Sequence, residues 1–216
     1  MGFVIAIDGP AASGKGTLAK RLGRAFGLPV LDTGLLYRAT AAAALAAGVD
    51  LEDAPGCATL ASRLNPAGLD ETTLRGPALG EAASRVAAHP AVRAALIAVQ
   101  RAFAQQSPGA VLDGRDIGAV IAPEASVKLF VTAATEVRAR RRWREIQAAG
   151  GVVGLDTVLA DIRRRDDRDS GRAAAPMRQA ADAILLDTSD LDIDAAFDAA
   201  RRIVEAARAA AEPNGS

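Results

Sequence analysis

The chain has 216 residues and a mass of 22.1 kDa, which suits one domain with a sizeable core. Half of its residues are apolar and 24% are charged, and this composition excludes a disordered chain. The 26 basic and 26 acidic residues balance, which argues against a general nucleic-acid-binding protein.

Cysteine and histidine each occur once, which limits the metal and redox chemistry that the chain can support. With Cys57 as its single cysteine, the chain can form neither an internal disulfide nor a cysteine zinc site. With His89 as its single histidine, it cannot supply a pair of histidine ligands. No apolar run approaches the ~18 residues of a membrane span. We therefore expect a cytoplasmic protein that binds neither a membrane nor nucleic acid.

The beginning of the chain predicts a strand–helix–strand–helix unit, which is typical of an α/β sheet with right-handed crossovers. A short, fully apolar run indicates a buried parallel strand. Leu18, Leu22 and Phe26 then form one helical stripe, and Gly27 ends it. The expected elements are a strand at 3–7, a helix at 15–26, a strand at 29–33 and a helix at 35–47.

The rest of the chain continues this alternation after an irregular stretch at 50–80, where proline and glycine predict short helices and turns. Together the predicted strands form a five-stranded parallel sheet flanked by helices, with no internal repeat. The later elements are a helical region at 81–106 interrupted at Pro90, strands at 110–113, 126–132 and 183–187, helices at 135–149 and 155–170, a closing helix through 193–204 and a frayed tail at 211–216.

Arginine is concentrated in the two helices at 135–149 and 155–170. Ten of the arginines lie between Arg138 and Arg172, with six acidic residues among them. The guanidinium fork matches phosphate oxygens bidentately, so the cluster suits phosphate recognition. A solvated helix face is the alternative that the sequence leaves open. The glycine-rich link at 150–154 predicts a flexible joint between the two helices.

A phosphate-binding loop is predicted between the first strand and the first helix. Its glycines let backbone N–H groups turn toward a polyphosphate at a positively polarised helix N-terminus, and its lysine brings a charge to the β- and γ-phosphates. A glycine at position 16 stands where serine or threonine is usual, and the alternative is a turn that binds nothing. The candidate ATP-binding residues are Gly9, Pro10, Ala11, Ala12, Ser13, Gly14, Lys15, Gly16 and Thr17.

Other nucleotide-binding classes fit the sequence poorly. The guanine-recognition stretch Asn-Lys-x-Asp is missing, because neither Asn65 nor Asn214 is followed by lysine. Large motor or transport ATPases need a longer chain. A small-molecule or nucleotide kinase remains.

Several sequence motifs resemble those of a known protein family. The Gly-Lys-Gly-Thr form of the loop resembles nucleoside monophosphate kinases. Within them, the chain resembles bacterial cytidylate kinases from about residue 3 to residue 206. The motifs that carry this are Ile7-Asp-Gly-Pro10, Leu31-Asp-Thr-Gly34 with Tyr37-Arg38, Asp113-Gly-Arg-Asp-Ile-Gly118 and Arg165-Asp-Asp-Arg-Asp169.

The resemblance implies an α/β P-loop kinase of one domain, 1–216, that works as a monomer and transfers the γ-phosphoryl group of ATP to CMP or dCMP. Its core would be about 1–48, 81–135 and 175–210, with a monophosphate-binding insert at 49–80 and an arginine-rich lid at 136–174. Longer family members carry a β-rich extension, for which 64–81 is too short. A kinase for UMP or a sugar acid, or a non-catalytic ATP-binding module, remains open.

Phosphoryl transfer depends on positioning and charge neutralisation, so cations must screen two polyanions. Lys15, Mg²⁺ and the lid arginines are the candidates. Arg165, Arg168, Asp169 and Arg172 are spaced to share one face if the helix persists to Arg172. The candidate catalytic residues are Lys15, Arg141, Arg165 and Arg172.

An acceptor site is predicted around Arg38, which, with the Thr33 hydroxyl, can hold the α-phosphate of the monophosphate. The resemblance implies phosphate contacts from several arginines, a serine near the base, Asp116 on the cytosine amino group and Asp169 on the sugar hydroxyls. Ion pairs with neighbouring arginines are the alternative for both aspartates. The candidate CMP-binding residues are Thr33, Arg38, Ser84, Arg93, Arg115, Asp116, Arg165, Asp169 and Arg172.

Asp113 is the candidate for metal placement, because strand-end carboxylates beside such loops orient Mg²⁺ through its waters. A turn-forming aspartate before Gly114 is the alternative. Tyr37 is expected to pack, His89 to cap or pack, and Cys57 to lie in the core. Trp143 either stacks on an arginine or covers the hinge.

Overall fold

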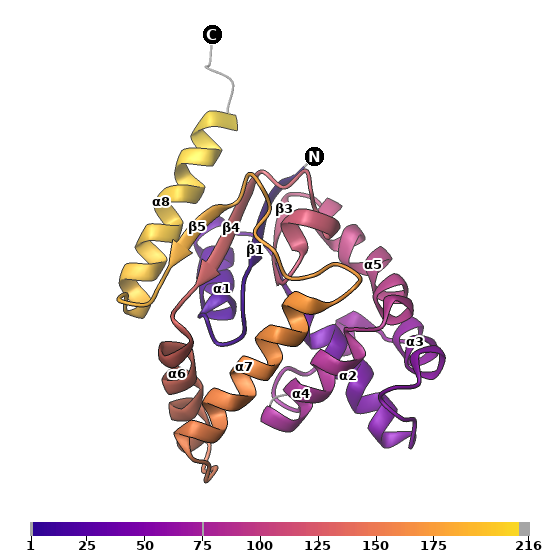
Figure 1. The fold of residues 1–216 in the computed structure, drawn as a ribbon. Helices are drawn as coiled ribbons and strands as arrows, with labels where there is room; N and C mark the ends of the chain where they lie inside the picture. Colours follow the sequence, from indigo (N-terminus) through magenta and orange to yellow (C-terminus); the bar gives the residue numbers. More distant parts are fainter. Residues whose placement is uncertain (1, 75, 212–216) are drawn as a thin grey trace.

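The structure of the protein is a computed structural model that describes residues 2–74 and 76–211. A parallel sheet of five strands lies at its centre, with helices on both sides (Figure 1). The strand order is β2-β3-β1-β4-β5. The strands are β1 (Phe3–Asp8), β2 (Val30–Asp32), β3 (Gly109–Gly114), β4 (Val127–Thr132) and β5 (Ile184–Asp187). The predicted five-stranded parallel sheet is therefore confirmed.

Helices connect the strands and also form two groups away from the sheet. The α-helices are α1 (Lys15–Phe26), α2 (Thr33–Ala46), α3 (Ala54–Ser62), α4 (Pro77–Val86), α5 (Pro90–Gln105), α6 (Thr135–Ala148), α7 (Leu155–Gly171) and α8 (Ile193–Ala211). A 3₁₀-helix, η1 (Pro66–Gly68), and a π-helix, η2 (Ile117–Ile121), complete the assigned helices among the described residues. None of the helices in these residues has the length and apolarity to span a membrane.

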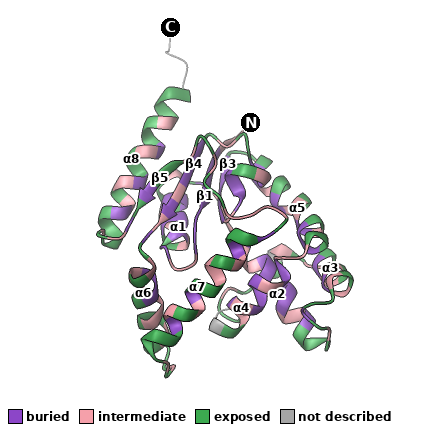
Figure 2. Ribbon diagram, viewed as in Figure 1, coloured by how far each residue is buried: buried purple, intermediate pink, exposed green. Residues whose placement is uncertain are grey.

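The sheet is covered on both faces, which explains why β1 is an uninterrupted apolar run. α1 and α8 pack on one face through residues such as Leu22 and Val204. α5 and η2 contribute to the cluster on the other face, with Ala104 and Ile117. The three central strands, β3, β1 and β4, are correspondingly buried, whereas most of the edge strand β5 and the outer helix faces are exposed (Figure 2).

Two further apolar clusters lie away from the sheet. Helices α2 to α5 pack around a cluster that includes Leu36, Val86 and Leu96. Helices α6 and α7 pack around a smaller cluster that includes Ala139 and Ile162. Because α7 crosses in front of the carboxyl end of the sheet (Figure 1), these two helical groups stand on either side of that end.

Two elements differ from the sequence-based expectation. Helix α4 begins at Pro77 rather than at residue 81, because a proline is well tolerated in the first turn of a helix. The π-helix η2 was not expected. Its start is fixed by Asp8, whose carboxylate accepts the backbone N–H groups of Ile117 and Gly118 at 2.8 Å each. The described part of 49–80 forms no strand, and residues 212–216 of the expected tail lie outside the described residues.

Candidate active site

The carboxyl end of the parallel sheet opens into a pocket of about 510 Å³, where ligands commonly bind in such folds. α2, α4, α5 and the α6–α7 pair supply its other walls. The predicted site residues that line it are Ala11, Ala12, Lys15, Gly16, Thr33, Arg38, Ser84, Arg93, Asp113, Arg115, Asp116, Arg165, Asp169 and Arg172. Gly14 and Thr17 line an adjoining pocket of about 270 Å³.

The loop at 9–17, here called the phosphate loop, has the backbone that its sequence predicts. Gly9 has a φ of 143°, and a Cβ there would lie 2.0 Å from the Val131 carbonyl oxygen. Ala12 has a φ of 58°, which an alanine adopts at a cost in strain, and such outliers gather at functional sites. The Lys15 ammonium donates to the Pro10 carbonyl at 2.9 Å, so the side chain curls back over the loop.

Lys15 and Asp113 form a buried pair at the centre of the site, with Nζ 3.8 Å from Oδ1. Burial lowers the pKa of Lys15 and raises that of Asp113, because both charged forms lose hydration. Asp113 Oδ1 is buried and has no hydrogen-bond partner among the described residues. A Cβ on Gly16 would approach Asp113 Oδ2 to 3.3 Å. The glycine therefore leaves room beside a carboxylate that still has an open acceptor.

Asp169 is the hub of the polar contacts on the α7 side of the pocket. Its carboxylate accepts from Ser84 Oγ at 2.9 Å and from Arg115 Nε at 3.0 Å, and Arg165 Nε lies 3.8 Å away. Burial alone raises the pKa of Asp169, but the neighbouring arginines outweigh it and hold the pKa below its usual range. The intrahelical pair with Arg165, an alternative left open by the sequence, is thus present.

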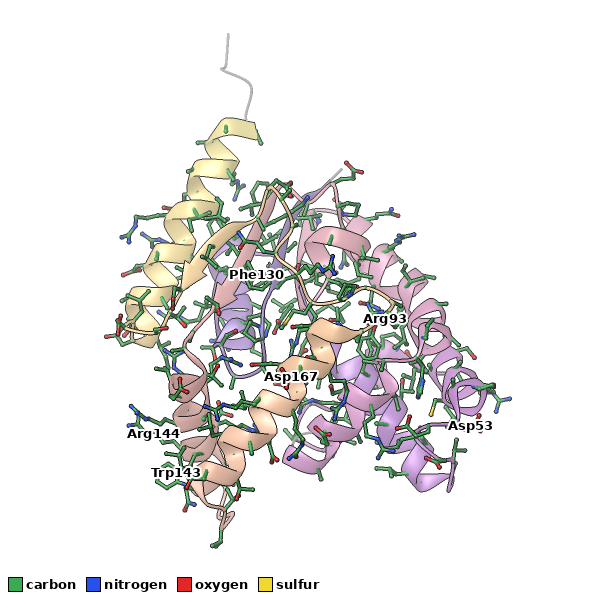
Figure 3. All side chains as sticks on the ribbon, in the orientation of Figure 1. Asp53, Arg93, Phe130, Trp143, Arg144 and Asp167 are labelled. Carbon is green, nitrogen blue, oxygen red and sulfur yellow. The ribbon has the colours of Figure 1, made fainter. Side chains whose placement is uncertain are left out.

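Asp116 pairs with Arg93, as one of the alternatives for this carboxylate anticipated. The contact joins Oδ2 of the carboxylate to an Nη of the arginine. The guanidinium also lies 5.7 Å from the centre of the Tyr37 ring, which packs in the helical cluster as expected. Figure 3 marks Arg93 on α5, across the pocket from α7.

The lid arginines Arg165 and Arg172 have buried donors without a hydrogen-bond partner in the part of the chain that the structure describes. Arg165 Nε and two nitrogens of Arg172, Nε and Nη2, are buried without a hydrogen-bond partner among the described residues. Burial lowers the pKa of Arg165 to about 10 and also lowers that of Arg172. Helix α7 ends at Gly171, so Arg172 reaches the pocket from extended backbone. Arg168 points instead to Glu81 on α4, at 2.6 Å.

Arg141, a predicted catalytic residue, does not line either pocket. Its guanidinium donates to the Thr188 hydroxyl at 3.0 Å, to the Thr188 carbonyl at 2.6 Å and to the Leu191 carbonyl at 3.2 Å. Its neighbour Arg142 lines both pockets and pairs with Glu145 at 3.0 Å. The sequence missed Arg142, although its spacing of four residues from Arg138 puts those two on one helical face.

Three other predicted loop residues, Gly9, Pro10 and Ser13, line neither of these two pockets. The link between α6 and α7 does line the larger pocket, through 151–153. The Trp143 indole donates to the Val153 carbonyl at 3.0 Å, so the tryptophan covers the hinge (Figure 3).

The remaining sequence expectations concern packing. His89 precedes α5, with Nε2 2.8 Å from the Leu51 carbonyl oxygen, and Cys57 is buried in the helical cluster. No group of three or more histidine, cysteine, aspartate or glutamate side chains gathers around a possible metal position in the described residues.

Comparisons with known proteins agree on one family. Residues 5–206 match the model of the cytidylate kinase family. A cytidylate kinase from Caulobacter sp. strain K31 is 59% identical over 209 residues, covering 97% of each chain. One from Xanthobacter autotrophicus is 63% identical over 207 residues, covering 96% of this chain and 99% of that one. An uncharacterized protein from Eubacterium ventriosum shares the fold, with a TM-score of 0.55 at 15% identity, over 94% of this chain and 98% of that one.

Proposed function

The chain belongs to the cytidylate kinase family, and from this premise we propose that its central pocket transfers the γ-phosphoryl group of ATP to CMP or dCMP, giving ADP and CDP or dCDP. The carrying observation is the set of buried guanidinium nitrogens on Arg165 and Arg172 that have no hydrogen-bond partner among the described residues. Leaving buried donors unpaired is costly, and because these donors carry positive charge they favour an anionic acceptor. Two phosphorylated substrates supply it.

ATP is proposed to bind along the phosphate loop. Lys15 lies at the N-terminus of α1, where backbone N–H groups and the helix dipole favour anions. Its ammonium donates to the Pro10 carbonyl and faces Asp113. A phosphate in the loop gives this charge a stronger partner, so Lys15 is positioned for the β- and γ-phosphates. Arg142, which lines both pockets, is a further cation on this side.

CMP is proposed to bind between α2, α5 and α7, with its α-phosphate near Thr33, Arg38 and the pocket arginines. Asp169 and Ser84, already bonded to each other, lie on the α7 side, where a sugar hydroxyl can be bound. Asp116 lies beside Arg93, which is in the first turn of α5. These positions support the acceptor site that the family resemblance implies, and they rest on geometry alone.

The residues at the carboxyl end of β3 fit a magnesium ion. Asp113 Oδ1 is a buried carboxylate oxygen with no hydrogen-bond partner among the described residues, and Gly16 leaves space beside it. Carboxylate oxygen is a preferred Mg²⁺ ligand, and Mg²⁺ keeps several waters when few protein ligands are present. We propose that Asp113 holds the ion through water; when bound, Mg²⁺ neutralises charge on the β- and γ-phosphates.

The reaction needs no covalent enzyme intermediate. The oxygen of the CMP phosphate attacks the γ-phosphorus, and the bond to the β-phosphate oxygen breaks, so ADP leaves. The protein's part is to hold both phosphates in line and to place cations around the charge that moves. Lys15 and the lid arginines serve this purpose from opposite walls of one pocket. We propose that the monomer contains the complete site, and that it works in the cytoplasm, where ATP and CMP are found.

An ADP-release assay with ATP and Mg²⁺, run across all nucleoside monophosphates and a set of sugar acids, tests the function. CMP and dCMP should be the best acceptors by kcat/KM, and the product should be the diphosphate. Preferential turnover of UMP or a sugar acid would overturn the acceptor assignment. ATP binding without turnover of any acceptor would instead indicate a non-catalytic ATP-binding module.

A further inference from the structure

Arg138 connects the phosphate loop to the lid, and nothing described so far gives it a role. It lies in the first turn of α6 and is only 4% exposed. Its guanidinium makes two bonds to one carboxylate on α7, at 3.1 Å and 2.7 Å, both to Asp166. It also donates to the Ala11 carbonyl of the phosphate loop at 3.3 Å. One side chain thus touches both substrate-binding parts of the proposed enzyme.

The geometry around Arg138 leaves it little freedom. Beyond these three bonds, Nε donates to the Ala133 carbonyl at 2.9 Å and Nη2 to the Thr135 hydroxyl at 2.9 Å. The five N–H groups of the guanidinium therefore all have partners. Bidentate, charge-assisted pairs of this kind fix orientation as well as adding energy. A residue tied at every donor cannot also bind a ligand, so Arg138 acts through its neighbours.

Its partner Asp166 is placed to control the pocket face of α7. Asp166 follows Arg165 directly and precedes Asp169 by about one helical turn. Those two flanking residues line the proposed monophosphate site, whereas Asp166 does not. Any rotation of α7 that breaks the pair with Arg138 would also move Arg165 and Asp169.

At its other end, Arg138 contacts a strained part of the phosphate loop. Ala11 precedes Ala12, the alanine held at a φ of 58°. A phosphate bound in this loop selects the loop conformation, and with it the direction of the Ala11 carbonyl. Among the described side chains, only Arg138 donates hydrogen bonds both to this carbonyl and to a carboxylate of α7.

We propose that Arg138 and Asp166 are positioning residues that couple ATP bound in the phosphate loop to the grip of Arg165 and Asp169 on the monophosphate. The inference rests on the proposed function and extends it to the energetic coupling between the two substrates. Coupling is reciprocal, so each substrate should raise the affinity for the other by one and the same factor. Couplings of this kind are typically about 5- to 150-fold.

A second ion pair between the same two helices offers a matched control. Glu136 on α6 pairs with Arg163 on α7 at 3.2 Å, with side chains 53% and 60% exposed. It joins α6 to α7 as the Arg138 pair does, but it touches neither the phosphate loop nor the pocket lining. Breaking it changes the contact between the helices without changing the proposed route.

The test is calorimetry of CMP binding with and without a non-hydrolysable ATP analogue and Mg²⁺. The ratio of the two dissociation constants measures the coupling. We expect a ratio above about fivefold for the unmodified protein and for Glu136→Gln. Asp166→Asn, which keeps the shape and removes the charge, and Arg138→Lys, which keeps the charge and loses the fork, should bring the ratio close to one.

The ratio separates positioning from general stability. Thermal unfolding of each variant reports stability, and a purely structural role would lower Tm while leaving the ratio intact. A preserved ratio in both Asp166→Asn and Arg138→Lys overturns the inference, as does a ratio near one in the unmodified protein. If the unmodified protein binds neither CMP nor any other monophosphate, the proposed function itself fails. Should Arg138→Lys not fold, Asp166→Asn decides the question alone.

Discussion

At the scale of single residues, Lys15 carries the largest expected effect. Its ammonium is buried, bonded to the Pro10 carbonyl and 3.8 Å from Asp113. Lys15→Ala should fold, because the raised pKa of Asp113 lets that carboxylate take up a proton when the lysine is lost. Turnover should fall by a factor of about 100 or more, because a preorganised charge of this kind stabilises the transition state by about 3 kcal/mol.

Steady-state ADP release and circular dichroism check this prediction, with Arg24→Ala as the control. Arg24 lies on the same helix and is exposed to solvent. Its variant should match the unmodified protein. If the activity of Lys15→Ala stays within threefold of the unmodified protein, the loop at 9–17 does not bind the ATP phosphates as proposed.

Asp116 is expected to set the preference for cytosine over uracil. Cytosine offers an amino donor where uracil has a carbonyl acceptor, and a carboxylate paired with Arg93 accepts hydrogen bonds but donates none. An unpaired buried polar group costs about 1–3 kcal/mol, so discrimination should be roughly 10- to 200-fold. Asp116→Ala should reduce kcat/KM for CMP far more than for UMP.

The ion pair with Arg93 supplies the competing outcome. If Asp116 only holds that arginine in place, its loss should reduce kcat/KM equally for both acceptors. Measuring the two acceptors side by side in the unmodified and variant proteins distinguishes these cases. Equal losses would move base selection elsewhere, to Ser84 or to the shortened insert.

The types of residue that line the pocket were largely predictable from the sequence, but the direction in which each side chain points was not. The motif spacing identified Lys15 because strand, loop and helix have to occur in that order. Arg141 and Arg142 are neighbours on one helix and so point about 100° apart. Arg141 is turned away from the pocket by its hydrogen bonds to Thr188, 47 residues further along the chain, and no local pattern encodes that contact.

At the scale of elements, helices bounded by glycine were predicted best. α1 spans Lys15–Phe26 as expected, because Gly14 and Gly27 both adopt positive φ at its ends. The π-helix η2 was missed because its apolar sequence carries no helical signal of its own. It depends on Asp8, more than a hundred residues earlier in the chain, accepting its first N–H groups.

The paired helices α6 and α7 should close over the pocket when both substrates bind. Their link contains Gly150, with a φ of 81°, and their pocket face carries arginines that repel one another without an anion. Phosphate removes that repulsion and closure excludes water. Amide hydrogen exchange of residues 138–172 should therefore slow with a bisubstrate analogue.

Helix α8 provides the internal reference for this measurement, because it packs on the outer face of the sheet away from the pocket. Its exchange should not change. Trp143 offers an independent signal, since it is the only tryptophan of the chain and bonds to the Val153 carbonyl in the link. Unchanged exchange over 138–172 would count against a lid.

At the scale of the whole molecule, the buried apolar residues form separate clusters, and the contacts that join the parts built on them are polar. The sheet, the α2–α5 group and the α6–α7 pair each have their own cluster of buried apolar residues. Ion pairs join them: Lys20 with Glu71, Arg168 with Glu81, and Arg115 with Asp169. Polar joints exchange readily with water, so the parts can move relative to one another while each core stays intact.

Asp8 in the sheet core is a buried carboxylate whose titration affects global stability. Asp8 ends β1 and holds the start of η2. Burial raises its pKa from 3.8 to about 6, against the lowering effect of the backbone N–H groups of Gly118 and Ile117. Asp116 adds to the rise and Lys15 opposes it. The other nearby cation, Lys128, is occupied by Asp182.

Because the folded-state pKa of Asp8 lies above the unfolded one, the folded protein binds this proton more tightly. The resulting stability is fully present below about pH 3.8 and is lost as the pH rises through about 6. Asp8→Asn cannot titrate, so the difference in unfolding free energy between the two proteins isolates this group. Between about pH 4.5 and pH 7, the unmodified protein should lose on the order of 2 kcal/mol of unfolding free energy relative to Asp8→Asn. Urea unfolding of both proteins across this range measures it, and a difference independent of pH would show that the Asp8 carboxylate is ionised throughout.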